Sequence, residues 1–273
     1  NAVDNIVPTA WEEIDYGLST GITDVGAVSA SKGVVNLTIK SPNSGTGVSF
    51  SYISRMGGGH IADGGTDGDT SGGRGMDFVA DLVNVSHPHF GLRIGMAGEI
   101  EIIDGTCKGT KTAGSNHTCG DKYFTDNPYG GTAYTTLKLG PLSLGVQGTF
   151  KDPMDPSIAG IANKRAVVAG AALTFGETIS FSYGQAWDRY KYNDATRGFG
   201  GQTRALGDMN QGSPGAGNEY ETITYNGFSA AINMGPVALK GTRNRVAGMG
   251  EGSSNTGEGL SKRHTEINLS IAF

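Results

Sequence analysis

The charged residues of this chain alternate with large apolar residues in a pattern that could place them on one surface. In residues 90–102, FGLRIGMAGEIEI, every second residue from Phe90 is apolar or glycine, and the other positions include Arg93 and two glutamates. Successive side chains of a β-strand point to opposite faces, so this segment is predicted to be a long strand with one apolar and one charged face. In each such strand, the alternate residues on the side opposite the apolar ones form what we call the polar phase. Ten candidate site residues lie in this phase: Lys40, Arg55, Asp77, Asp81, Arg93, Glu99, Glu101, Lys138, Lys240 and Glu266.

The chemistry that suits this set is contact with water and ions. Acidic and basic groups on opposed walls of an aqueous lumen would create a transverse field, which orients dipolar solutes and sets a weak ion preference. Local salt bridges inside a solvated interior are the alternative interpretation. Nucleophilic catalysis fits poorly, because none of the 5 histidines pairs with a serine on the apolar face as a lipid hydrolase would require. We therefore expect that the protein is not an enzyme.

Cys107 and Cys119 are the 2 cysteines of the chain, and both lie in the segment CKGTKTAGSNHTC. A metal site would need more thiols or a pair of histidines, and this segment offers one histidine. The pattern therefore favours a disulfide that closes a surface loop, in an oxidising compartment, over free thiols.

The acidic segment DGGTDGDTSGG, residues 63–73, partly matches a calcium-binding loop. Asp67, Asp69 and Ser71 occupy the first, third and fifth positions of an EF-hand-like spacing, but the twelfth position is Phe78 in place of the bidentate glutamate. The segment predicts a weak external Ca²⁺ site at most, and a flexible acidic loop is the alternative. No other cofactor is expected.

The elements that must position these residues are strands. Alternating segments recur along the whole chain and predict one all-β domain, residues 1–273, of about twelve strands. Their connections alternate between short and long, and the long ones are near 25–33, 57–74, 104–131, 151–164, 194–218 and 247–261. Short turns at one end and long loops at the other are typical of an up-and-down antiparallel barrel in an outer membrane.

Composition excludes other classes of protein. The 273 residues include 46 glycines and 37% hydrophobic residues, and the formal net charge is -5. This mild acidity argues against a nucleic-acid partner. No segment approaches the roughly 20 apolar residues that a membrane helix needs. The apolar residues are few but regularly spaced, which argues against a disordered chain.

The polarity of the two strand phases predicts which face points inward. In a soluble barrel, bulky apolar side chains fill the interior. Here the phase opposite the apolar one is rich in glycine, serine, threonine, alanine and ionisable residues, which suit contact with water. Apolar alternation over about nine to eleven residues per strand matches the outward band that lipid requires. We therefore expect a transmembrane β-barrel whose apolar side chains point outward.

Three segments carry a resemblance to a known class of protein. INLSIAF alternates apolar residues and ends on Phe273, and LKLGPLSLGVQG and AAINMGPVALKG each read as two strands joined by a Gly-Pro turn. In these features the chain resembles Gram-negative outer-membrane β-barrels of the porin kind. General porins usually have about sixteen strands, so the count of about twelve departs from that pattern. A barrel of about 14 or 16 strands would require further hairpins in 104–131 and 194–218.

The resemblance implies a function, a location and partners. It implies a channel in the bacterial outer membrane for passive diffusion of small hydrophilic solutes or ions, in contact with the lipid bilayer and lipopolysaccharide, and it favours a homotrimer. It also implies that the connection 104–131 folds into the barrel and narrows it. The alternative is a loop-plugged structural or binding barrel that presents its external loops to a partner or surface layer.

Two arginines in the outward phase are candidates for a lipid contact. Arg243 and Arg245 lie just beyond the apolar part of their predicted strand. Guanidinium groups bind phosphate with two parallel hydrogen bonds, so they could pair with lipopolysaccharide phosphates. Ordinary rim charges are the alternative.

Overall fold

The computed structural model describes residues 34–42, 44–53, 74–102, 126–152, 154, 161–176, 178–192, 204–206, 209–211, 220–251 and 259–271. All regular structure within these ranges is β-strand. The described residues contain no helix that is long and apolar enough to span a membrane.

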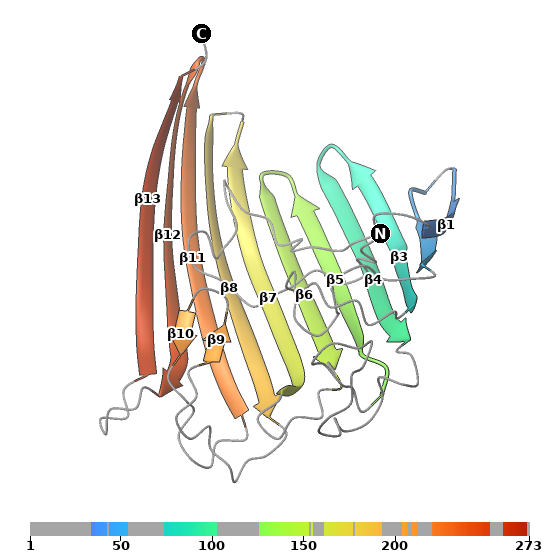
Figure 1. Cartoon of the computed structure of the whole chain (residues 1–273). Coiled ribbons are helices and arrows are strands. Elements are labelled where there is room, and N and C mark those ends of the chain that lie inside the picture. The colour runs from blue at the N-terminus through green and yellow to red at the C-terminus, as the bar shows by residue number, and fades with distance from the viewer. Residues whose placement is uncertain are drawn as a thin grey trace.

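Eleven strands of the described residues form one antiparallel sheet, in which each strand pairs with its neighbours along the chain (Figure 1). The predicted all-β, up-and-down antiparallel architecture is therefore confirmed. The strands are β1 (Val34–Lys40), β2 (Gly47–Ile53), β3 (Arg74–His87), β4 (Phe90–Ile102), β5 (Tyr129–Leu139), β6 (Leu142–Asp152), β7 (Ile161–Phe175), β8 (Ile179–Tyr192), β11 (Tyr220–Met234), β12 (Val237–Glu251) and β13 (Gly259–Ile271).

A separate short hairpin accounts for the two remaining strands, β9 (Arg204–Leu206) and β10 (Met209–Gln211). It lies in the segment where a barrel with more strands would need an additional hairpin. Each of its strands has 3 residues, whereas a membrane-spanning strand needs about nine. This hairpin therefore adds no spanning strand. The sequence predicts about twelve long strands and the described sheet contains eleven, with β1 and β13 at its edges.

Tight turns join the long strands at one end of the sheet, as Figure 1 shows for β3–β4, β5–β6, β7–β8 and β11–β12. The turns Gly140-Pro141 and Gly235-Pro236 connect strands whose last residues pair directly across the ladder. Gly140 has φ of 57° and Gly235 has φ of 60°. A positive φ at the first of two loop residues matches a type II′ turn, which accounts for glycine there and for proline after it.

The two faces of the sheet differ in polarity in the way that the sequence predicts. The large apolar side chains that are exposed belong to the predicted outward phase, and Ile267 is the extreme case with 75% of its surface exposed. Buried polar and charged side chains lie on the other face, among them Asp77, Gln147 and Asn244. We call these the outer face and the inner face.

One feature of the inner face was not expected from the sequence. Val168, Ala186, Tyr225 and Val246 lie next to one another in register across β7, β8, β11 and β12, and each is at most 2% exposed. Ile223, also on the inner face of β11, is fully buried. The expectation that this face suits contact with water therefore does not hold for this row.

Candidate functional site: the charged inner face

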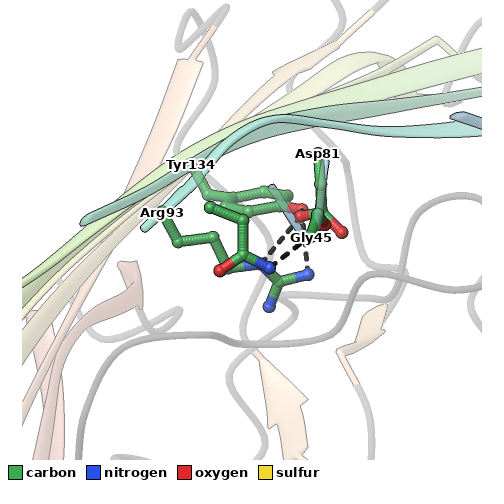
Figure 2. A network of polar contacts seen from close by, with 5 residues as sticks. Gly45, Asp81, Arg93 and Tyr134 are labelled. Carbon is green, nitrogen blue, oxygen red and sulfur yellow. Dashed lines mark hydrogen bonds and ion pairs between the residues drawn. The ribbon is translucent and has the colours of Figure 1, made fainter. Parts of the chain in front are cut away.

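A network of three side chains from three adjacent strands lies on the inner face (Figure 2). Arg93 on β4 donates from Nε to Oδ1 of Asp81 on β3 at 2.7 Å, and from Nη2 to the hydroxyl of Tyr134 on β5 at 3.2 Å. The Tyr134 hydroxyl in turn donates to Oδ1 of Asp81 at 2.8 Å. Each member therefore fixes the other two. Beside this network, the Asn84 amide donates to the carbonyl of Gly45 at 3.3 Å.

Gly95 makes this network possible. It lies directly between Asp81 and Tyr134 in the ladder, since Asp81 pairs with Gly95 and Gly95 pairs with Tyr134. A Cβ atom at Gly95 would lie 2.3 Å from the Tyr134 hydroxyl oxygen and 2.8 Å from the carbonyl oxygen of Ala80. Side chains with a Cβ do not tolerate such contacts, so only glycine lets the tyrosine ring cross β4 and reach the carboxylate.

A bulge in β3 sets the position of Asp81 relative to Arg93. Asp81 pairs with Gly95 and Val83 pairs with Ile94, so Leu82 is the additional residue. A bulge of this kind increases local twist and redirects side chains. Asn84, rather than Asp81, faces Arg93 directly, and the arginine reaches the aspartate along the diagonal.

The network is partly open on the inner face. The Arg93 side chain is 41% exposed and that of Asp81 is 25% exposed. The guanidinium carbon of Arg93 also lies 5.1 Å from the centroid of the Tyr134 ring, within the range of a cation–π contact. Two partners thus hold one guanidinium in a fixed orientation while part of it stays accessible to solvent. Such a group can contact an anion or a polar molecule in the solvent beside this face.

A second charged pair is buried on the same wall. Nζ of Lys151 on β6 lies 3.2 Å from Oε1 of Glu99 on β4, and both side chains are less than a tenth exposed. The intervening residue of β5 is Gly130, and a Cβ there would lie 3.2 Å from both Glu99 and Lys151 atoms. Asp77 is directly opposite Glu99 and is also buried. The lysine therefore offsets part of the repulsion between two neighbouring carboxylates.

Neutral polar groups continue along the inner face. Gln147 donates to the Thr132 hydroxyl at 3.2 Å, and this hydroxyl donates to the carbonyl of Gly148 at 3.0 Å. The buried hydroxyls of Ser182 and Ser229 are 2.6 Å apart. These contacts satisfy polar groups that would otherwise be costly to bury. Hydrogen-bonded polar groups thus lie on the inner face between β5 and β6 and between β8 and β11, beside the buried apolar row.

The remaining predicted charges that the structure describes also lie on the inner face. Lys40 and Lys138 are exposed, and Lys240 and Glu266 are partly exposed. Glu266 lies 3.5 Å from Nε2 of His264. Among the described residues of β3 to β6, acidic and basic side chains form local pairs, which is the alternative that the sequence left open to opposed acidic and basic walls. A strand period assigns a face but not a neighbour, so the sequence could not show this pairing.

Several predicted residues cannot be placed. Arg55, the disulfide candidates Cys107 and Cys119, and the calcium-loop candidates Asp67, Asp69 and Ser71 lie outside the described residues, as does the side chain of Glu101. Within the described ranges, no group of three or more His, Cys, Asp or Glu side chains could hold a metal ion.

Two members of the charged clusters were missed from the sequence. Tyr134 and Lys151 both stand in the polar phase of their strands but were not selected as site residues. Lys151 could have been found from the sequence, because it is the next residue after Thr149 in the polar alternation of this strand. Tyr134 could have been recognised only by knowing that Gly95 lies opposite it, and that pairing needs the register.

Comparisons with known proteins give distant likenesses among solved structures alone. No protein-family model matches the chain, and none of the curated proteins matches it. Among solved structures, the chain is similar to one described as a NanC porin in a rhombohedral crystal form, with a TM-score of 0.37 and 10% sequence identity over 88% of this chain and 92% of that chain. A likeness at this level carries no argument about function.

Proposed function

We propose that the chain closes into a barrel in a bacterial outer membrane and forms a narrow aqueous channel for passive diffusion of small hydrophilic solutes or ions. One observation carries the proposal: the exposed large apolar side chains of the sheet lie on the outer face, and its buried polar and charged side chains lie on the inner face. A water-soluble barrel needs the opposite arrangement, whereas a barrel surrounded by lipid needs this one.

Strand length supports the same proposal. Strands β3 to β8 and β11 to β13 each contain 11 to 15 residues. A membrane-spanning strand tilted by about 45° needs roughly nine to eleven residues to cross the hydrocarbon core. Closure would also pair the backbone groups at the two edges of the sheet, which cannot stay unpaired in lipid.

The charged inner face indicates what the lumen would accept. Barrels of about eight strands are filled by side chains and those of about sixteen leave an open channel, so a sheet of intermediate size suits a narrow passage. The partly exposed Arg93 and Asp81 would offer a solute one cation and one carboxylate close together. Hydrated ions and small polar molecules fit such a lining better than apolar compounds do.

A second candidate function has its own supporting observation. The buried apolar row on the inner face, which includes Val168, Tyr225 and Val246, is covered almost completely. A lumen filled with water would leave such side chains wet, so this row favours a barrel that is plugged at that level. A plugged barrel would serve to present its external loops to a partner or surface layer.

Single-channel recording with a matched pair of cysteine variants tests the proposal. Thr135 and Thr136 are adjacent on β5, both partly exposed, and they face the outer and inner sides respectively. In a background with both native cysteines replaced by serine, we expect stepwise conductance in planar bilayers. A cationic, membrane-impermeant thiol reagent should reduce it for Thr136→Cys and leave Thr135→Cys unchanged.

Two outcomes of this experiment would contradict the channel. Silent bilayers from folded protein would support the plugged barrel in its place. Modification at Thr135→Cys but not at Thr136→Cys would show that the two faces are reversed, and the membrane barrel itself would then be wrong.

A further inference from the structure

Three arginines form a cluster on the outer face of β12 and β13. Arg245 is directly opposite Arg263 in the ladder, and Arg243 lies two residues from Arg245 on the same face, opposite Thr265. All three side chains are exposed. We call Arg243, Arg245 and Arg263 the outer arginine cluster. The sequence suggested a lipid contact for the first two, and the register adds the third.

The outer arginine cluster is surrounded by exposed apolar side chains. Arg243 is directly opposite Phe228 of β11, which is itself opposite Tyr183 of β8. Leu239 of β12 and Ile267 of β13 continue the same face toward the short turns, and both are exposed. Cations next to an exposed apolar surface match an amphipathic anion, which has a charged group and a hydrocarbon part.

The sheet itself does not neutralise these charges. Like charges directly opposite one another in a ladder are destabilising. On the outer face of β11, β12 and β13, none of the side chains that the structure describes is acidic, and the nearest carboxylate of β13, Glu266, faces inward opposite Thr242. Asn226, opposite Arg245, accepts a hydrogen bond at Oδ1 from Tyr183 at 3.1 Å, so its amide nitrogen is available to donate.

We propose that the outer arginine cluster binds a phosphate group of an outer-leaflet glycolipid of the lipopolysaccharide kind, whose acyl chains then lie along Phe228, Leu239 and Ile267. The proposal rests on the proposed membrane location. Arginine favours phosphate because its planar guanidinium donates two parallel hydrogen bonds and is weakly hydrated. Beyond Gly241, β12 runs toward the long connections, which lie on the external side of such barrels, so the cluster is on the side of the outer leaflet.

Charge decides between this lipid and a second copy of the chain. The other basic residues that the structure describes in the outer phase are Lys191, Arg165 and Arg189, and the two arginines are directly opposite one another. Asp152 is the one acidic side chain among the described residues of the outer face. A second copy would therefore bring mainly cations to the cluster. An anionic headgroup supplies the complementary charge, and the exposed apolar residues explain why it belongs to a lipid.

Lipid titration by native mass spectrometry tests the site on the full chain in a maltoside detergent. The probes are diphosphoryl lipid A, the same lipid without its phosphates, and inorganic phosphate. We expect the triple variant Arg243→Gln/Arg245→Gln/Arg263→Gln to bind diphosphoryl lipid A at least tenfold more weakly than the wild type. The control Lys240→Gln removes one charge from the inner face of β12 and should bind as the wild type does.

Variants are compared only when they show the heat-modifiable gel mobility of a folded barrel. If the triple variant fails to fold, Arg263→Gln alone separates the opposed pair and should weaken binding at least threefold, with Arg263→Lys weakened less. Unchanged binding in these variants would overturn the proposal. Equal binding of the lipid without phosphates would also overturn it, and so would competition by inorganic phosphate at the lipid's own concentration.

Self-association provides the last discriminating result. If the wild type, but not the triple variant, forms oligomers in lipid-free detergent, the cluster is an interface between copies and the lipid proposal is wrong. The lipid-binding measurement can succeed or fail independently of the conductance measurement that tests the channel. Silent bilayers together with arginine-dependent lipid binding would remove the channel and keep the lipid site.

Discussion

Replacing Gly95 with alanine should disrupt the network of Asp81, Arg93 and Tyr134, although none of these three residues is itself substituted. The added Cβ would lie 2.3 Å from the Tyr134 hydroxyl oxygen and 2.4 Å from Cζ of the same ring. The ring must therefore move away from β4. Tyr134 would then lose its hydrogen bonds to Asp81 at 2.8 Å and from Arg93 at 3.2 Å.

The expected loss of stability follows from these two contacts. A hydrogen bond to a charged group contributes about 1.5–3 kcal/mol to the free energy of unfolding, and partial exposure of both charged partners favours the low end of this range. Two such bonds amount to about 3 kcal/mol. Alanine in a strand recovers about 0.5–1 kcal/mol relative to glycine. We therefore expect Gly95→Ala to lower the free energy of unfolding by at least about 2 kcal/mol, because the close contact with the carbonyl of Ala80 adds to the loss.

A double-mutant cycle with Tyr134→Ala measures the effect. Urea unfolding in phospholipid vesicles, followed by tryptophan fluorescence, gives the free energy of unfolding for the wild type, both single variants and the double variant. With alanine at residue 134 the ring is absent, but the contact of the new Cβ with the backbone carbonyl of Ala80, at 2.8 Å, remains. Gly95→Ala should therefore still destabilise the protein, but by less than it does beside tyrosine, and the difference should be a coupling of about 0.5–3 kcal/mol, as for contacting residues.

Additive costs in this cycle would refute the reasoning. If Gly95→Ala destabilised the protein equally with tyrosine and with alanine at residue 134, the ring would not lie over Gly95. The position of the network would then not depend on the absence of a side chain at Gly95.

Three further predictions concern the charged pairs and the outer face. Arg93→Gln should shift the reversal potential in a KCl gradient toward cation preference, because Asp81 keeps its charge and loses its cationic partner. Arg93→Lys keeps the positive charge and should shift the reversal potential less. Equal reversal potentials for the wild type and Arg93→Gln would mean that the pair does not contact the ion path. Lys151→Met should lower the free energy of unfolding by about 3–5 kcal/mol, because it leaves buried Glu99 next to Asp77 without its described cation. Lys151→Met/Glu99→Gln should recover much of that loss in the same urea assay, and no recovery would contradict the pairing. Leu144→Arg on the outer face should lower the free energy of unfolding of the vesicle-inserted protein by about 2–4 kcal/mol. Ser143→Arg, at the adjacent inner-face residue, should lower it much less. Equal losses for the two variants would contradict the assignment of faces.

The alternation of apolar and polar residues along single segments was enough to predict the class of fold. Alternation in segments such as 90–102 and 142–150 reports a local property, because backbone geometry places successive side chains of a strand on opposite faces whatever the neighbours are. The Gly-Pro turns are equally local, since they depend on the φ angles of two residues. The strands, their up-and-down order and the polarity of both faces follow from these features.

The partners of each charged side chain could not be predicted in this way. Asp81 and Arg93 were both assigned to the inner face, but their contact depends on a bulge at Leu82 and on Gly95 opposite Tyr134. The same holds for Glu99 and Lys151, which meet across Gly130. Opposed acidic and basic walls were a reasonable expectation from face alone, and the register replaced them with local pairs.

The sequence by itself determined which residues are strands and which face each side chain takes, because both depend on a period of two along one strand. Only the tertiary structure decided which side chains meet, including the Arg245 and Arg263 pair on the outer face and the buried row containing Val168 and Tyr225. Contacts between strands depend on the register, and a shift of one residue in one strand would change every pair along it while leaving the sequence pattern as it is.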